Sequence, residues 1–180
     1  MALLLRISQR IDALNRFVGR AVSWLILVAV LVSAGNAVSR KVLNLSSNAM
    51  LEVQWYLFSS VFLLCAGYTL LNKEHVRVDL LLSRLSRRGH LIVEIIGTLL
   101  FLVPLAVLIM VLSWPPFVDA WTSGEVSANA GGLIRWPVKL LIPVGFALLL
   151  LQAASELIKD FAELRQLAQA GSGPRPDGQS

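Results

Sequence analysis

Few side chains in this sequence could take part in catalysis or bind a metal ion. The chain has two histidines, His75 and His90, and a single cysteine, Cys65. A structural or catalytic metal centre needs three or four such ligands, and haem ligation needs His or Met inside the surrounding helices. The sequence contains no glycine-rich phosphate loop, nucleophile elbow or paired catalytic carboxylates. We therefore expect no enzymatic activity, no cofactor and no metal site.

The composition indicates the kind of protein that must position these side chains. Hydrophobic residues make up 56% of the chain, charged residues only 15%, and the mean hydropathy is +0.71. Soluble domains carry about 25% charged residues, and their apolar residues alternate with polar ones. Here the apolar residues fall in long blocks, which is typical of an integral membrane protein. The net charge of +5 is small and scattered, which argues against a nucleic-acid partner.

Four apolar stretches are long enough to cross a bilayer, which takes about 20 residues in a helix. We predict spans over about 21–38, 51–71, 91–114 and 136–158. Each must be helical, because lipid offers the backbone no hydrogen-bonding partner. The sequence predicts an all-α, polytopic membrane protein with a single domain over 1–165. We expect span three to end at Pro115-Pro116 and a disordered tail over 166–180.

The distribution of positive charge predicts the orientation. Twelve of the 16 lysines and arginines lie in the amino-terminal segment, the loop between spans two and three, or the tail. Cytoplasmic loops carry such an excess, so both termini should be cytoplasmic. Segments 3–20 and 78–88 are amphipathic, with apolar residues on one side and arginines on another. We predict that both are helices lying on the inner leaflet.

Charged residues are absent from the middle of all four predicted spans. Glu52 lies at the outer entrance of span two, and Glu94 lies near the inner end of span three. A carrier that couples transport to an ion by itself would place carboxylates or broken helices near the midplane. The sequence therefore predicts a scaffold. At the outer side, Arg40 and Glu52 flank a short hairpin, and we predict that they bind each other or jointly bind a partner, with Trp55 beside them.

Several motifs resemble the small membrane subunit (DctQ type) of tripartite ATP-independent periplasmic (TRAP) transporters. They are Asn-Ala-Val-Ser-Arg at 36–40, Leu-Glu-Val-Gln-Trp-Tyr at 51–56, Glu-His-Val-Arg-Val-Asp-Leu at 74–80 and Ser-Ala-Asn-Ala-Gly-Gly-Leu-Ile-Arg-Trp-Pro at 127–137. The motif at 74–80 contains His75, Arg77 and Asp79, and it is the most specific of the four. The chain departs from many relatives at 52–54, where it carries one acidic residue instead of two.

The resemblance implies a subunit of the bacterial inner membrane that packs against a large membrane subunit. In such systems a periplasmic binding protein delivers a solute, commonly a carboxylate, and the large subunit carries it inward with sodium. The candidate residues for partner contacts or structure are Arg40, Glu52, Trp55, His75, Arg77 and Asp79. Membrane lipid is a further expected partner.

Two other classes of function compete with this interpretation. A membrane anchor for a redox enzyme would need histidines in the spans, where the sequence has none. A small multidrug-type exporter would need a carboxylate inside the first span, which also has none. The transported solute cannot be inferred from this chain, because its binding site would lie on other subunits.

Overall fold

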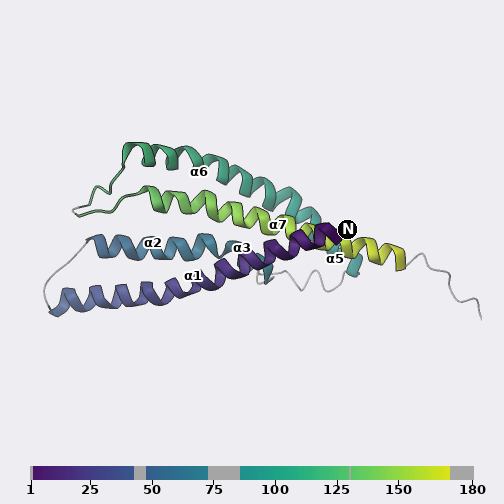
Figure 1. Ribbon diagram of the computed structural model, residues 1–180, viewed down its shortest axis with the longest axis horizontal. Coiled ribbons are helices and arrows are strands. Elements are labelled where there is room, and N and C mark those ends of the chain that lie inside the picture. Colours follow the sequence, from purple (N-terminus) through teal and green to yellow (C-terminus); the bar gives the residue numbers. More distant parts are fainter. Residues whose placement is uncertain (1, 43–47, 73–85, 130, 171–180) are drawn as a thin grey trace, which may run out of the picture.

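Four long helical segments lie side by side in a computed structural model that describes residues 2–42, 48–72, 86–129 and 131–170 (Figure 1). The first is α1 (Ala2–Val42), and the second consists of α2 (Asn48–Leu64) and α3 (Ala66–Leu71). The third joins α5 (Arg87–Gly97), the π-helical turn η1 (Thr98–Leu102) and α6 (Val103–Ser123), and the fourth is α7 (Trp136–Ala170). Among the described residues no strand forms, so the all-α fold class is confirmed.

Each of the four segments is long and apolar enough to cross a membrane, as predicted. The candidate spans within the described residues are Leu3–Val42, Asn48–Leu71, Arg87–Ser123 and Trp136–Gln169. Large apolar side chains cover the outside of the bundle; Phe62, for example, is 81% exposed. The buried apolar residues are mostly small, such as Ala29, Ala106 and Ala153. This arrangement, with large apolar side chains outside and small ones inside, is suited to a lipid environment. In lipid, burial of apolar surface gives no driving force, so helices associate through close packing and polar contacts.

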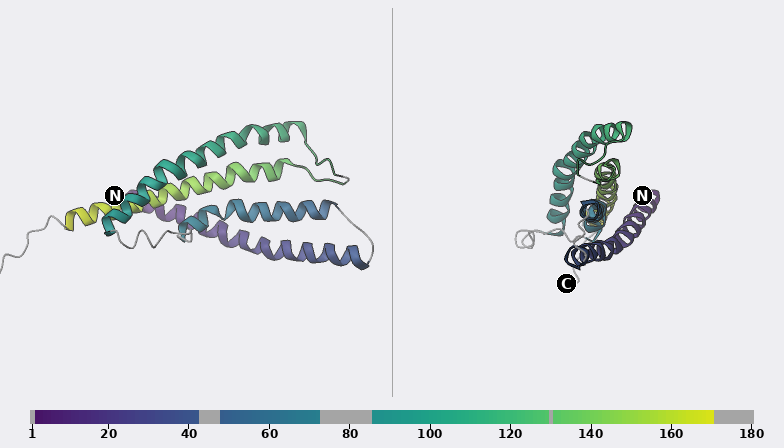
Figure 2. Two further views of the ribbon diagram at one scale, coloured as in Figure 1. Left: turned by 180° about the vertical axis from the view of Figure 1, so that it is seen from behind. Right: turned by 90° about the vertical axis from the view of Figure 1, so that its left-hand side faces the viewer.

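Helix α1 combines two elements that the sequence analysis treated separately. The predicted helix over 3–20 and the predicted span over 21–38 form one continuous helix of 41 residues. At 1.5 Å per residue such a helix is about 60 Å long, roughly twice the hydrocarbon thickness. The amino-terminal end of α1 lies beside the carboxy-terminal half of α7, at the same end of the bundle (Figures 1 and 2). How this end sits in the membrane remains a prediction.

The third segment contains three prolines and is longer than predicted. Pro104 lies two residues after the end of η1, and a proline lacks the N–H that would bind the carbonyl four residues earlier. That carbonyl, of Leu100, lies within η1, so the π turn coincides with the missing hydrogen bond. The prediction that Pro115-Pro116 ends this span is wrong, because α6 continues through both prolines to Ser123. It ends at Gly124, whose φ of 62° is the left-handed conformation that glycine adopts easily at a helix end.

Helix α7 is the centre of the bundle, and α1, α2, α3, α5 and α6 all pack against it (Figure 2). It extends twelve residues beyond the predicted end of span four at 158, to Ala170. Residues 166–170, which were predicted to belong to a disordered tail, are therefore helical. The predicted helix over 78–88 lies mostly outside the described residues, although Arg87 and Arg88 form the start of α5.

Candidate functional site

At the end of the bundle that is predicted to be the outer one, a single carboxylate binds the loop between α6 and α7; the names outer clamp and inner network follow this predicted orientation. Glu52, on α2, accepts hydrogen bonds from three groups in the loop between α6 and α7. The Asn129 side-chain amide lies at 2.8 Å, the Leu133 backbone N–H at 2.7 Å, and the Ser127 hydroxyl also donates to Glu52. An ionised carboxylate is a strong acceptor, so this outer clamp fixes a loop that lies about 80 residues further along the chain.

The same loop also carries an acid that pairs with two cations, one at the end of the loop and one in the first turn of α7. Arg135 and Lys139 both form ion pairs with Glu125, with the Arg135 side chain at 3.5 Å. The Lys139 hydrogen bond, with the positive charges of Lys139 and Arg135, lowers the pKa of Glu125 below its usual value despite partial desolvation. Backbone pairing of Val126 with Ile134 narrows the loop, and the Tyr56 hydroxyl donates to the Ile134 carbonyl at 3.1 Å. The loop is therefore held in place by the Glu52 carboxylate and by the ion pairs of Glu125.

The outer clamp changes the prediction made for Arg40. No ion pair or hydrogen bond joins Arg40 to Glu52 in the part of the chain that the structure describes. In the described structure the carboxylate has three donors from the loop instead, and the alternative that Arg40 and Glu52 jointly bind a partner stays a prediction. Trp55 lines a pocket of about 360 Å³ together with Glu52 and is 70% exposed. The other candidates, His75, Arg77 and Asp79, lie outside the described residues.

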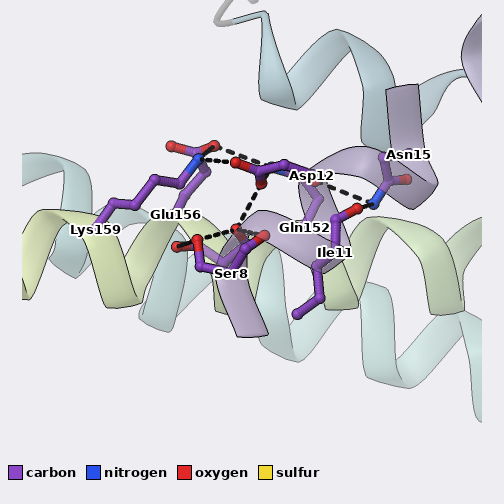
Figure 3. Close-up of polar contacts among 8 residues, drawn as sticks. Ser8, Ile11, Asp12, Asn15, Gln152, Glu156 and Lys159 are labelled. Carbon is purple, nitrogen blue, oxygen red and sulfur yellow. Dashed lines mark hydrogen bonds and ion pairs between the residues drawn. The ribbon is translucent and has the colours of Figure 1, made fainter. Parts of the chain in front are cut away.

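A second polar cluster joins α1 to α7 at the other end of the bundle (Figure 3). This inner network consists of Ser8, Asp12 and Asn15 from α1 and Gln152, Ser155, Glu156 and Lys159 from α7. Ser8 and Asn15 are completely or almost completely buried, as are Gln152 and Ser155. Seven polar side chains thus occupy an interface that the sequence analysis did not predict, although it noted that Gln152 and Ser155 could bond across helices.

Each helix supplies both donors and acceptors to the inner network. The Gln152 amide nitrogen donates to Asp12 at 2.9 Å and to Glu156 at 3.0 Å, while its oxygen accepts from Asn15 at 3.0 Å. The Ser155 hydroxyl donates to Asp12 at 2.6 Å. Lys159 lies between two carboxylates, at 3.0 Å from Asp12 and 2.6 Å from Glu156. The buried Asn15 amide oxygen has no partner among the described residues, but the other contacts favour one register, because a shift would leave further buried groups unpaired.

A heptad pattern in the sequence could have revealed this interface. Five buried residues of α1 recur at intervals of seven: Ser8, Asn15, Val22, Ala29 and Asn36. A seven-residue repeat is the spacing that keeps one side of a helix against a neighbour in left-handed packing. The sequence analysis instead assigned faces of 3–20 by the contrast between apolar residues and arginines, and so overlooked the third, polar side of the helix.

Between the two polar clusters, glycines allow the helices to approach closely. A Cβ atom added to Gly145 on α7 would lie 2.6 Å from the Leu63 carbonyl oxygen of α2. One added to Gly67 on α3 would overlap the Asn15 amide oxygen and lie 3.1 Å from the Leu148 carbonyl oxygen. Gly19 on α1 packs in the same way against the Tyr68 ring. Small residues at such contacts are characteristic of helix packing in membranes.

The described residues contain no group of three or more His, Cys, Asp or Glu that could hold a metal ion. Cys65 is half-buried in the turn between α2 and α3, and burial raises the cost of ionising a thiol. His90 lies on α5 at 3.5 Å from Glu94, one turn further along.

This architecture defines a polytopic α-helical membrane protein whose helices are joined by polar clusters at both ends. Residues 29–163 match the family described as tripartite ATP-independent periplasmic transporters, DctQ component. Because the match covers more than half of the chain, the protein belongs to the DctQ family and is a small component of a TRAP transporter. Comparisons with curated proteins and with solved structures gave no match.

Proposed function

We propose that the chain is the small permease subunit of a bacterial TRAP transporter and braces the large membrane subunit in the inner membrane. The large subunit then takes up a small organic solute, of which a carboxylate is the main candidate, together with sodium. A periplasmic binding protein delivers the solute. In this proposal both termini are cytoplasmic, so the outer clamp faces the periplasm. The DctQ family match over residues 29–163 is the observation that carries the proposal.

The distribution of polar side chains supports the role of a scaffold. Within the inner network Lys159 pairs with Asp12 and Glu156, and in the outer clamp neutral donors bind Glu52, which leaves apolar side surfaces for lipid and a partner. A scaffold for a moving subunit has to keep its own shape, and buried polar contacts at both ends serve that purpose. No described residue places a carboxylate at mid-span, where a coupling-ion site would be expected.

The outer surface offers a place where partners could be recognised. Arg40 and Trp55 are exposed at this end, whereas Glu52 is occupied by the loop. Large aromatic and arginine side chains are the residue types that most often contribute strongly to protein interfaces. We propose that Arg40 and Trp55 contact the large subunit or the binding protein, with Glu52 holding the loop in the shape that either partner meets.

Reconstitution tests the proposal directly. Proteoliposomes that contain the large subunit are supplied with binding protein, solute and a sodium gradient, with and without this chain. Uptake should require the chain and the sodium gradient, and the chain alone should bind no solute. Arg40→Ala and Trp55→Ala should weaken uptake, whereas Ala34→Ser, an exposed position in the same helix as Arg40, serves as a control. Full sodium-driven uptake without this chain would contradict the bracing role.

A further inference from the structure

The cytoplasmic-end half of α1 has three different sides. Ser8, Asp12 and Asn15 face α7 in the inner network. A second side carries exposed apolar residues, among them Leu3 (70% exposed), Ile7 (44%) and Leu14 (43%). The remaining side carries Arg6, Arg10, Arg16 and Arg20, all exposed, and is named the arginine face here. The sequence pattern alone had separated only the last two sides.

The arginine face has no protein acceptor in the described residues, neither by ion pair nor by side-chain hydrogen bond. Asp12 is the single acidic residue of α1, and it is committed to Lys159, Ser155 and Gln152 on α7. Four positive charges therefore lie along one helix with nothing in its own sequence to neutralise them.

Other arginines at the same end of the bundle behave differently. Arg87, at the start of α5, forms a two-pronged pair with Glu163, with its Nε at 2.7 Å and its Nη2 at 2.8 Å from the two carboxylate oxygens. Arg88 donates to the Leu167 carbonyl. Arg87 and Arg88 thus join α5 to α7 through acceptors on α7. The arginine face has no such acceptor among the described residues, and this contrast indicates that it binds a ligand outside the chain.

The surroundings of the arginine face identify the chemistry of that ligand. A hollow of about 500 Å³ beside Arg6 and Arg10 is also lined by the apolar residues Leu3 and Ile7. Trp24 lies one helical turn beyond Arg20, on the same side of α1, and is 71% exposed. A guanidinium group binds phosphate oxygens in a fork, and apolar side chains next to it suit acyl chains. We infer that the arginine face binds the headgroups of anionic phospholipids, whose acyl chains lie against Trp24 and the neighbouring apolar side chains.

The inner network makes this binding specific to one orientation of the helix. Because Ser8, Asp12 and Asn15 are fixed against α7, the arginines cannot rotate away from the surface of the bilayer. Anionic lipid would thus be held at a defined place around the bundle instead of being attracted diffusely. This inference concerns the chain by itself and does not depend on the proposed transport function.

Quenching of Trp24 fluorescence by brominated lipids tests the inference. A background with Trp55, Trp114, Trp121 and Trp136 replaced by phenylalanine leaves Trp24 as the single tryptophan. The full chain is placed in bilayers that contain equal fractions of brominated phosphatidylglycerol or brominated phosphatidylcholine. Phosphatidylglycerol should quench more strongly, with a relative association constant higher by about fivefold for each participating arginine. Added salt should reduce this preference, because it screens exposed charges.

A charge-matched control comes from the other end of the same helix. The double variant Arg16→Gln/Arg20→Gln should lose most of the preference, whereas Arg40→Gln/Lys41→Gln removes the same charge and should keep it. Native mass spectrometry of lipids retained by the chain with all five tryptophans gives the same comparison without the phenylalanine background. Equal quenching by the two lipids, or equal losses in the two double variants, would overturn the inference. So would retention of the lipid preference in Arg16→Gln/Arg20→Gln together with loss of binding to the large subunit, which would make the arginine face a protein interface.

Discussion

The contact between Gly67 and Asn15 gives the sharpest test of how the helices pack. In Gly67→Ala, the new methyl group would overlap the Asn15 amide oxygen, lie 3.0 Å from the Asn15 Cγ and lie 3.1 Å from the Leu148 carbonyl oxygen. Ordinary van der Waals contact begins at about 3.4 Å. Asn15 is completely buried and donates to Gln152, so it has little room to turn aside. The contact with Leu148 is with its backbone carbonyl, which can move even less readily than a side chain.

The expected loss of stability follows from two destabilising contributions and one that offsets them. Overpacking of a well-packed contact costs about 1–3 kcal/mol. Turning Asn15 away would also break its hydrogen bond to Gln152, worth about 1 kcal/mol in a membrane protein. Alanine is a better helix former than glycine by about 1 kcal/mol, which offsets part of this loss. Gly67→Ala should therefore destabilise the bundle by about 1–3 kcal/mol. Gly35→Ala, in α1, should stabilise it slightly, because a Cβ there meets nothing within 4 Å.

Unfolding in mixed detergent, followed by circular dichroism, measures both variants under the same conditions. The double variant Asn15→Ala/Gly67→Ala gives a further check, since shortening Asn15 removes the group that the new methyl meets. The two single losses should then fail to add, because residues in direct contact couple. If Gly67→Ala were as stable as Gly35→Ala, or if the effects of Gly67→Ala and Asn15→Ala added strictly, the close approach of α3 to α1 would be refuted.

Three other predictions concern the charged groups and the orientation. Lys159→Met should destabilise the bundle by about 2 kcal/mol because it leaves two carboxylates facing each other, and adding Asp12→Asn should restore part of the loss in the same unfolding assay. As the pH falls below about 4.3, Glu125 should stay ionised longer than a free glutamate, because its pKa in the folded protein is lowered. The stability that its ion pairs provide is therefore complete above the usual pKa of glutamate and is lost as the pH falls through the lower, folded-state pKa. Amide exchange over 124–135 should therefore accelerate only at the more acidic pH, and acceleration beginning near pH 6 would contradict this. Alkaline phosphatase should be active when inserted within 124–132 and inactive at the carboxy terminus; the reverse result would overturn the predicted orientation.

The helices could be predicted from the sequence to the extent that local chemistry decides them. Long apolar blocks require membrane helices, and each of the four predicted stretches falls within a helical segment that is long and apolar enough to cross a membrane. Their ends were less predictable. A proline in the middle of a helix removes a hydrogen bond, yet Pro115 and Pro116 lie within α6, where Trp114, Phe117 and Trp121 stack along the helix and Trp121 meets Trp136 of α7 edge to face. Tertiary packing of this kind can outweigh a local penalty and is invisible to a reading of the segment alone.

The partners of Glu52 illustrate a second reason why part of the structure could not be predicted from the sequence. Sequence proximity and opposite charge favoured Arg40, twelve residues earlier. The structure instead brings the loop at 127–133 to Glu52 and satisfies the carboxylate with an amide, a hydroxyl and a backbone N–H. None of these donors is charged, so charge pairing could not have identified them. The heptad of buried residues in α1, by contrast, was present in the sequence and would have indicated the polar interface with α7.

The lipid bilayer explains why polar contacts, and not apolar burial, hold the helices in one arrangement. In a bilayer, apolar surface gains nothing from burial between helices, so the contacts that select one arrangement have to come from other forces. Here the charged and amide contacts lie at the two ends, and close packing at glycines joins the helices between them. Joining α1 to α7 at one end and the loop to α2 at the other fixes segments that are far apart in the chain. The apolar sides take no part in these contacts, so the proposed lipid on the arginine face and the proposed partner subunit would bind without competing with the fold.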